Sequence, residues 1–168
     1  RILRKGRRKY LDPTHPEVQK FIRADIERIR SWGYELMKHD FSTADLFGDY
    51  GGNLDATITN YEGWHFYDKT KTNAEIVLDF YRLILEAAGD MLIIGCNTIS
   101  HLSAGLVHIY RTGDDTSGYH WDRTRDMGVN TLAFRLAQNE NFYMCDADCV
   151  GIVKGKIPWE LNRQWLHL

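Results

Sequence analysis

Residues 36–41 have the sequence Leu36-Met37-Lys38-His39-Asp40-Phe41 and indicate the fold more strongly than any other stretch. Gly33 ends the preceding helical segment, and the apolar residues around the charged ones predict a buried strand over residues 34–41. Because side chains alternate along a strand, Lys38 and Asp40 share one face and the residues between them share the other. We therefore expect this strand to present an ammonium and a carboxylate together near its carboxyl end.

Strand-like and helix-like segments alternate along the rest of the chain. Helices are expected over residues 17–32, 73–88, 102–107, 121–137 and 158–168, and further strands over 91–96, 107–112 and 142–152. This order predicts about four βα units in an α/β fold with a parallel sheet. A closed (β/α)₈ barrel needs about 250 residues, so 168 residues predict a partial TIM barrel, its later part. An open doubly wound domain is the alternative, but the first βα turn has no glycine-rich phosphate fingerprint.

We expect residues 1–168 to belong to one barrel domain with two additions. Residues 1–12 are strongly basic and predict a solvated hairpin or loop, with an anion-binding arm as the alternative. Residues 42–72 are rich in glycine, aspartate and aromatic residues and predict a long loop insertion. Loops of that length are often binding loops. Three aromatic residues are candidates for stacking on a ligand ring, with core packing as the alternative: Trp64, Tyr67 and Trp121.

Composition and charge exclude several classes of protein. The chain has 43% hydrophobic and 26% charged residues, which is typical of a globular domain. A net charge of -2 argues against a nucleic-acid partner, and no apolar run is long enough for a transmembrane helix. Three cysteines do not indicate a disulfide framework. The sequence does not define the compartment, and the absence of an Asn-x-Ser/Thr sequon is compatible with the bacterial cytoplasm or periplasm.

Carboxylates follow three of the expected strands. The ammonium of Lys38 would keep Asp40 ionised, as a nucleophile requires, and a buried structural ion pair is the alternative. Arg111 precedes Asp114 and Asp115, and if the strand continues, Arg111 and Asp115 share a face; a turn followed by a helix cap is the alternative. Two carboxylates on different strands that face one pocket suit glycoside hydrolysis.

The segment Cys145-Asp146-Ala147-Asp148-Cys149 supports a second type of chemistry. Asp146 and Asp148 would share one face of a strand and could hold a hard cation. A metal-dependent hydrolase is therefore an alternative. It lacks support from a zinc motif, because the two cysteines have the wrong spacing for a zinc site and no His-x-His or His-Glu-x-x-His pattern occurs.

Taken in order, these segments resemble the catalytic barrel of the α-galactosidase (melibiase) clan of glycoside hydrolases, clan D, nearest its bacterial family 36 branch. The resemblance covers roughly residues 8–166 and lies in the series of short motifs. The matching motifs are Tyr10 to Val18 before a barrel helix, Lys38-His39-Asp40-Phe41, Arg111 to Thr116, and Asp146-Ala147-Asp148-Cys149.

The resemblance implies retaining hydrolysis of terminal α-galactosides, or related α-glycosides, with no cofactor and no metal. Asp40 would be the nucleophile and Asp115 the general acid and base, chosen over Asp114 because it would share a strand face with Arg111 and has the family's spacing from that arginine. The substrate-binding residues would be Lys38, Arg111, Cys96, Asn97 and Asp148. The expected partner is a carbohydrate, and members of the clan often form homo-oligomers. The clan's first strands supply further sugar-binding residues, so we expect the 168 residues alone to be inactive.

Three departures from the family pattern bear on substrate identity more than on the reaction type. His39 stands between the lysine and the nucleophile, where the family usually has an aromatic or small residue. Asn97 to His101 replace the family's Gly-Gly-x-Arg run, and Asp-Ala-Asp replaces Asp-Pro-Asp. A catalytically inactive carbohydrate-binding barrel is therefore another alternative to the enzyme.

Overall fold

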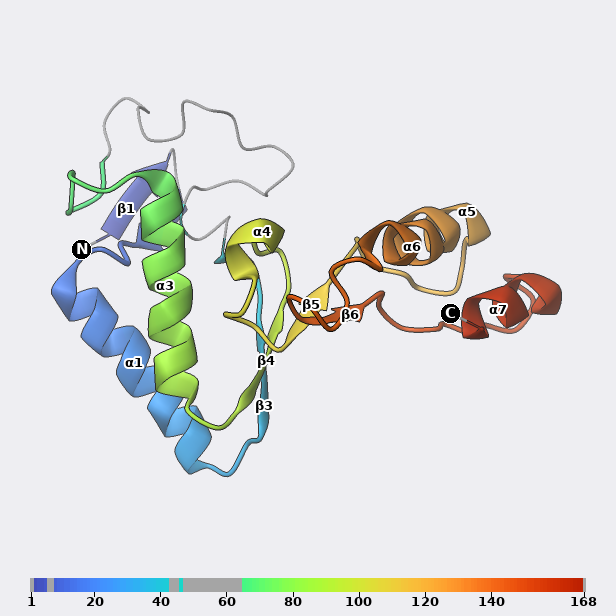
Figure 1. The fold of residues 1–168 in the computed structure, drawn as a ribbon, viewed down its shortest axis with the longest axis horizontal. Coiled ribbons are helices and arrows are strands. Elements are labelled where there is room, and N and C mark those ends of the chain that lie inside the picture. The colour runs from blue at the N-terminus through green and yellow to red at the C-terminus, as the bar shows by residue number, and fades with distance from the viewer. Residues whose placement is uncertain (1, 6–7, 43–45, 47–64, 168) are drawn as a thin grey trace. The chain divides into compact units, whose positions relative to one another are not determined.

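A computed structural model describes residues 2–5, 8–42, 46 and 65–167 (Figure 1). Most of the expected loop insertion at 42–72, including Trp64, lies outside these residues. The chain divides into two compact units, Arg1–His108 and Ile109–Leu168, and we describe each by itself.

The first unit begins with a hairpin and continues as two βα repeats. Strands β1 (Ile2–Lys5) and β2 (Arg8–Leu11) pair antiparallel, as residues 1–12 predict. The elements that follow are α1 (Pro16–Ser31), β3 (Leu36–His39), α3 (Asn73–Ala88), β4 (Leu92–Gly95) and the short α4 (Ser100–Ser103). Strands β3 and β4 are parallel, with Leu36 beside Leu92 and His39 beside Gly95. Their carboxyl ends, and therefore the residues that follow them, lie side by side.

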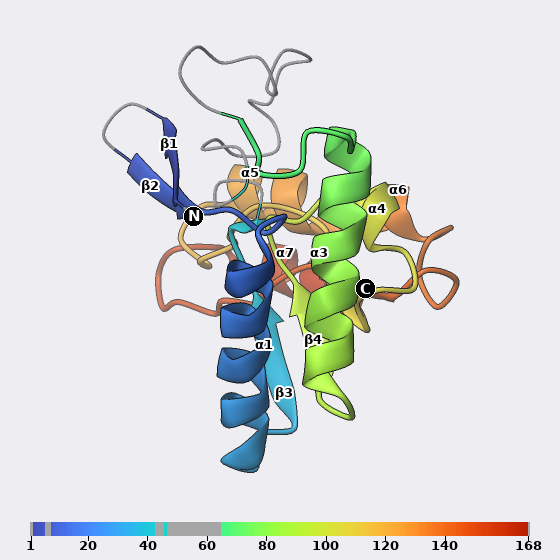
Figure 2. The ribbon, with the colours of Figure 1, turned by 90° about the vertical axis from the view of Figure 1, so that its left-hand side faces the viewer.

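Helix α3 supplies the core of the first unit. It begins with a capping box in which Thr72 and Glu75 bond each other's backbone N–H groups, so Thr72 and not the expected first residue Asn73 is the cap. Its most buried aromatic residue is Tyr81, 1% exposed, while Phe80 and Leu83 are only partly buried. The core cluster around it comprises Leu46, Phe66, Ile76, Val77 and Tyr81. Helix α1 runs beside α3 in both views of the ribbon (Figures 1 and 2), and Arg23 joins Glu86 across them at 2.8 Å.

Strand β3 is shorter and more exposed than the sequence predicts. It covers Leu36–His39 instead of residues 34–41, and Leu36 is 46% exposed. The expected alternation is nevertheless present, because His39 packs on α3 while Leu36 and Lys38 lie on the other face. Only one face of the strand is therefore covered by the described residues of this unit.

The second unit repeats the strand–helix order. Its elements are β5 (Ile109–Arg111), α5 (Trp121–Thr124), a π-helical stretch (Arg125–Asn130), α6 (Thr131–Arg135), β6 (Met144–Asp146) and α7 (Trp159–Leu166). Strands β5 and β6 are parallel, with Arg111 beside Asp146. The expected helix over 121–137 is thus present, with a π-helical centre. The expected strand over 142–152 is present only over Met144–Asp146, and Asp148 has a left-handed φ of 71° that ends the extended conformation.

The chain is therefore a mixed α/β structure whose central strands form two parallel pairs. This agrees with the predicted strand–helix units, and the barrel itself stays a prediction. In the described part of the chain, no helix is both long and apolar enough to cross a membrane.

Candidate active site

The ends of β3 and β4 bring Lys38, Asp40 and Asn97 together. Asp40 directly follows β3, and its Oδ2 lies 2.9 Å from the Nζ atom of Lys38. Its Oδ1 accepts hydrogen bonds from Asn97 Nδ2, at 2.8 Å, and from the backbone N–H of Phe41, at 2.8 Å. Cys96, 6% exposed, precedes Asn97, and its Sγ lies 3.8 Å from Asn97 Nδ2. Four of the residues that the sequence singled out thus form one cluster.

These contacts determine the charge of Asp40. Partial burial by itself would raise the pKa of this carboxyl. The hydrogen bonds from Asn97, Lys38 and the Phe41 backbone, with the charge of Lys38, outweigh burial and hold the pKa below its ordinary value. The pair is open to solvent on the described side, since the side chain of Lys38 is 49% exposed and that of Asp40 is 20% exposed. Asp40 is therefore an ionised and accessible carboxylate near neutral pH.

Two residues at this cluster have a backbone conformation that L-residues seldom adopt. Phe41, next to Asp40, has φ of 60°, and Asn97, next to Cys96, has φ of 48°. Such conformations cost about 1–3 kcal/mol each, and they persist only where surrounding contacts hold them. The turn at Asn97 allows its side chain to reach the carboxylate on the neighbouring strand.

His39 lies on the opposite face of β3 and has no part in this cluster. Its ring packs edge-on against the rings of Phe80 and Tyr81, at 5.5 Å between centroids in each case. Burial lowers the pKa of His39 to about 4, and the nearby charge of Asp40 offsets this only in part. His39 is therefore a neutral packing residue that precedes the candidate nucleophile in the chain.

A stability change with pH follows from His39. The unfolded chain binds a proton at His39 near pH 6.5 and the folded chain only near pH 4, so the folded state loses stability as pH falls between these values. We expect a loss of about 3 kcal/mol in the free energy of unfolding across that range. Urea unfolding of wild type and His39→Gln from pH 7 to pH 4 measures the difference, with replacement of the exposed His101 of α4 (His101→Gln) as control. Equal pH dependence in wild type and His39→Gln would contradict this prediction.

The second unit brings Arg111, Asp115 and Asp148 together. The side chain of Arg111 is 9% exposed and lies at the end of β5. Its Nη2 contacts Asp148 Oδ2 and, at 3.0 Å, Asp115 Oδ1. Its Nε–H is buried and has no hydrogen-bond acceptor among the described residues. A buried guanidinium with one unsatisfied N–H is a site to which a ligand oxygen can bind.

The contact between Arg111 and Asp115 forms by a route that differs from the expected one. Strand β5 ends at Arg111, so Asp115 does not share a strand face with it. The chain turns after Thr112 and brings Asp115 back to the guanidinium, with its side chain 82% exposed. Asp114 is directed elsewhere and pairs with Arg123 at 2.7 Å. The strand argument for Asp115 is therefore wrong, although Asp115 does contact Arg111, and its role as the general acid stays a prediction.

The loop that carries Asp115 is fastened to the loop after β6. Thr116 donates its backbone N–H to Asp148 Oδ2 at 2.6 Å and its hydroxyl to the Cys149 carbonyl at 2.8 Å. Thr112 donates its backbone N–H to the Asp146 carbonyl at 2.8 Å. Further along, Gly118 lies so close to Gly151 that a Cβ atom at Gly118 would collide with the Gly151 carbonyl.

Replacing Gly118 tests whether the Asp115 loop is held against the loop after β6. Gly118 and Gly155 have similar left-handed φ angles, +74° and +71°, but no atom lies within 4 Å of a Cβ placed at Gly155. We expect Gly155→Ala to cost about 1–2 kcal/mol, the cost of the conformation alone. Gly118→Ala should lower the thermal unfolding midpoint further and displace the Asp115 loop, because the collision adds to that cost. Equal midpoints for the two variants would show that the loops are not held at this point.

Arg123 is a functional candidate that the sequence did not indicate. In addition to its contact with Asp114, its Nε donates to the backbone carbonyl of Asp115 at 2.8 Å. It therefore contacts the loop at both Asp114 and Asp115. An arginine on a helical segment carries no motif, so no sequence signal identified it.

The alternative metal site at Asp146 and Asp148 is not assembled in the structure. Asp148 is engaged by Arg111 and Thr116, and Asp146 accepts the backbone N–H of Asp148 at 2.9 Å. In the ranges 8–42 and 65–167, no group of three histidine, cysteine, aspartate or glutamate side chains could hold a metal ion.

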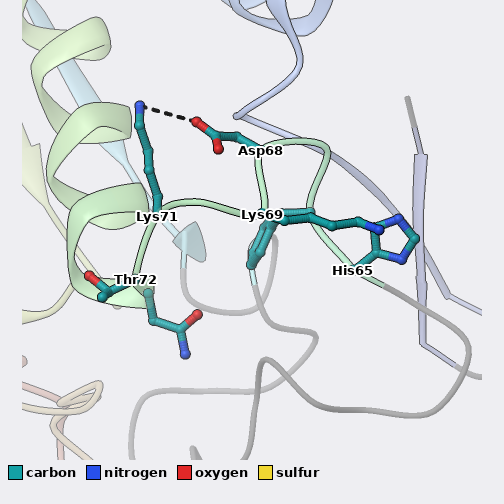
Figure 3. A pocket seen from close by; sticks show the side chains of 7 residues that line it. His65, Asp68, Lys69, Lys71 and Thr72 are labelled. Atoms are coloured by element: carbon teal, nitrogen blue, oxygen red, sulfur yellow. Dashed lines mark ion pairs between the residues drawn. The ribbon is translucent and has the colours of Figure 1, made fainter.

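A separate pocket of about 540 Å³ lies at the start of α3 (Figure 3). Its described lining runs from His65 to Asn73 and includes Lys69 and Lys71, and Lys71 pairs with Asp68 at 3.9 Å. The buried Asp12 orders this segment by accepting the backbone N–H of Tyr67 at 2.7 Å. None of the predicted catalytic or binding residues lines this pocket, and the Tyr67 ring packs against His15 at 4.7 Å.

Comparison with known proteins shows a likeness in fold but no match in sequence. No protein-family model matches the chain, and no curated protein matches it in sequence. The fold is similar to that of an α-galactosidase domain, and this likeness in structure is consistent with the family resemblance of the sequence motifs.

Two solved structures are similar to this chain in fold. One is an α-galactosidase from Thermus thermophilus in complex with p-nitrophenyl α-D-galactopyranoside, with a TM-score of 0.71 and 19% identity over 98% of this chain and 35% of that chain. The other is an α-galactosidase from the same organism in complex with stachyose, with a TM-score of 0.59 and 18% identity over 92% of this chain and 32% of that chain. The chain thus spans about a third of the length of these enzymes. At this identity the likeness shows a shared fold.

Proposed function

We propose that this chain is part of the (β/α)₈ barrel of a retaining glycoside hydrolase that acts on terminal α-galactosides. Asp40 is the nucleophile and Asp115 the general acid and base. The observation that carries the proposal is the state of Asp40, an accessible carboxylate at a strand end that Lys38 and Asn97 hold ionised.

The reaction proceeds in two displacements. In the first, an oxygen of Asp40 forms a bond to the anomeric carbon while the bond from that carbon to the leaving oxygen breaks, and Asp115 gives its proton to the leaving oxygen. In the second, Asp115 takes a proton from water, the water oxygen bonds to the anomeric carbon, and Asp40 departs as a carboxylate. Two inversions at one carbon give net retention.

Asp115 has the accessibility that its role requires. Its carboxylate is largely exposed, yet Arg111 holds it at 3.0 Å and Arg123 holds its backbone carbonyl. A general acid must reach the leaving oxygen and keep a defined orientation. The expected short separation between Asp115 and Asp40 stays a prediction.

The substrate-binding residues follow from the same two clusters. Lys38 and Asn97 contact the nucleophile and are proposed to bind sugar hydroxyls next to the bond that is cleaved, with the buried Cys96 beside Asn97. The unsatisfied Nε–H of Arg111 is proposed to donate to a further sugar oxygen, with Asp148 holding the guanidinium in place.

The choice of galactose rests on the neighbours, whose complexes contain a galactopyranoside and stachyose. It is tested by exposing the full-length protein to a panel of aryl α-glycosides with different axial hydroxyls, followed by ¹H NMR of the first sugar released. The proposal predicts hydrolysis of the α-galactoside with the α-anomer formed first. A first-formed β-anomer, or tight sugar binding with no hydrolysis of any member, would contradict it.

A further inference from the structure

The hydroxyl of Tyr81 lies in the core behind the candidate active site. Tyr81 is 1% exposed on the inner face of α3, and its ring packs against that of His39. A buried phenol needs hydrogen-bond partners. Here the partners come from two separate strand ends.

The two hydrogen-bond partners of the Tyr81 hydroxyl follow Asp40 and Asn97 in the chain. Ser42, 0% exposed and two residues after Asp40, places its Oγ 3.1 Å from the Tyr81 hydroxyl. Ile99, two residues after Asn97, donates its backbone N–H to the same hydroxyl at 3.0 Å. One oxygen atom thus joins the chain after β3 to the chain after β4.

The two residues held by Tyr81, Ser42 and Ile99, follow the two strained residues within two positions of the chain. Phe41 and Asn97, with φ of 60° and 48°, lie between the strand ends and the points held by Tyr81. Left-handed conformations at non-glycine residues persist only where neighbouring contacts fix them. The Tyr81 hydroxyl is such a contact for both turns, and these turns determine whether Asn97 Nδ2 reaches Asp40 Oδ1 at 2.8 Å.

We propose that Tyr81 is a positioning residue for the nucleophile: its hydroxyl fixes the chain after β3 and β4 so that Asn97 and Asp40 remain in contact. This inference rests on the proposed function for its role in catalysis, but the geometric part stands on the contacts alone. It assigns a role to a side chain that does not touch the substrate.

The test uses Tyr81→Phe in the full-length protein, which removes the oxygen and keeps the ring packing. We expect kcat/KM to fall about 10- to 100-fold, since a small displacement of a reacting group has effects of that size. In the Asn97→Ala background the same change should have less than about a twofold further effect, because the contact through which Tyr81 acts is already lost. Multiplicative losses in the double variant would overturn the proposal.

A second readout does not depend on enzymatic activity. The charged group that faces Asp40 among the described residues is Lys38, and the adjacent His39 is neutral above its pKa of about 4. In ¹³C NMR of protein labelled at aspartate Cγ, with the Asp40 signal assigned by its loss in Asp40→Asn, the Asp40 titration should move to higher pH in Tyr81→Phe. An unchanged titration would overturn the positioning role, whatever happens to activity.

Tyr143→Phe is the matched control. Tyr143 is 4% exposed and donates its hydroxyl to Gln138 at 2.8 Å, just before β6 begins. Its loss removes a partly buried hydrogen bond at the amino end of β6 that involves none of the residues around Asp40, so the Asp40 titration should stay as in wild type. A shift equal to that of Tyr81→Phe would show that general loosening is the cause and would contradict the proposal. If wild type hydrolyses no glycoside, the proposed function fails, and the titration still decides the role of Tyr81.

Discussion

Replacing Asp40 with asparagine should lower kcat on α-galactosides by at least about 10⁴-fold, as losing a catalytic nucleophile does in other enzymes. The amide has nearly the same shape, so Lys38 and Asn97 can still surround it, but it cannot form the glycosyl ester. The measurement is kcat on an aryl α-galactoside with the full-length protein. A loss of less than tenfold would exclude Asp40 as the nucleophile.

Restoring activity with added azide distinguishes the nucleophile from the general acid by the configuration of the product. In Asp40→Ala, added azide can attack the anomeric carbon from the face that the carboxylate has left. One inversion from an α-substrate gives the β-galactosyl azide. An α-azide from this variant would contradict the assignment, because it would require a second nucleophile on the protein.

Replacing Asp115 with alanine should have an effect that depends on the leaving group. Without a proton donor, kcat/KM on substrates with poor leaving groups should fall about 10²- to 10⁴-fold, the usual contribution of general acid catalysis. A dinitrophenyl α-galactoside needs no protonation to depart and should lose far less in the first displacement. The comparison of the two substrates in wild type and variant is the measurement.

Asp114→Asn is the control for this prediction. Asp114 is adjacent in sequence and pairs with Arg123 instead of Arg111. Its replacement weakens support for the loop but removes no proton donor, so both substrates should be affected equally. A dependence on the leaving group in Asp114→Asn and not in Asp115→Ala would reverse the assignment of the acid.

The sequence predicted the parts of the site that depend on short-range rules. Alternation along β3 placed Lys38 and Asp40 on one face and His39 on the other, and the structure confirms this. Asn97 was indicated as a substrate-binding residue only through the family resemblance, and its contact with Asp40 was found in the structure. The carboxyl end of α3 was also predicted, since Gly89 follows the expected helix over 73–88, whereas the capping box of Thr72 and Glu75 at its start was not predicted.

The parts that the sequence did not predict depend on contacts between distant residues. Ser42 and Tyr81 are far apart in the chain, and a tyrosine on the inner face of a helix is also an ordinary core residue. The chain turns at Asp148 because its side chain bonds Thr116 and Arg111, a pairing that no local pattern encodes. Likewise, the close approach of Gly118 and Gly151 is a tertiary property of two loops.

The most direct test of the retaining mechanism is intact-mass spectrometry of the full-length protein after treatment with an activated, mechanism-based α-galactoside inhibitor. The account predicts a mass gain of one glycosyl unit, mapped to the peptide that contains Asp40 and absent in Asp40→Ala. An adduct on another carboxylate, or no adduct in folded protein after treatment with a series of α-configured sugars, would contradict it.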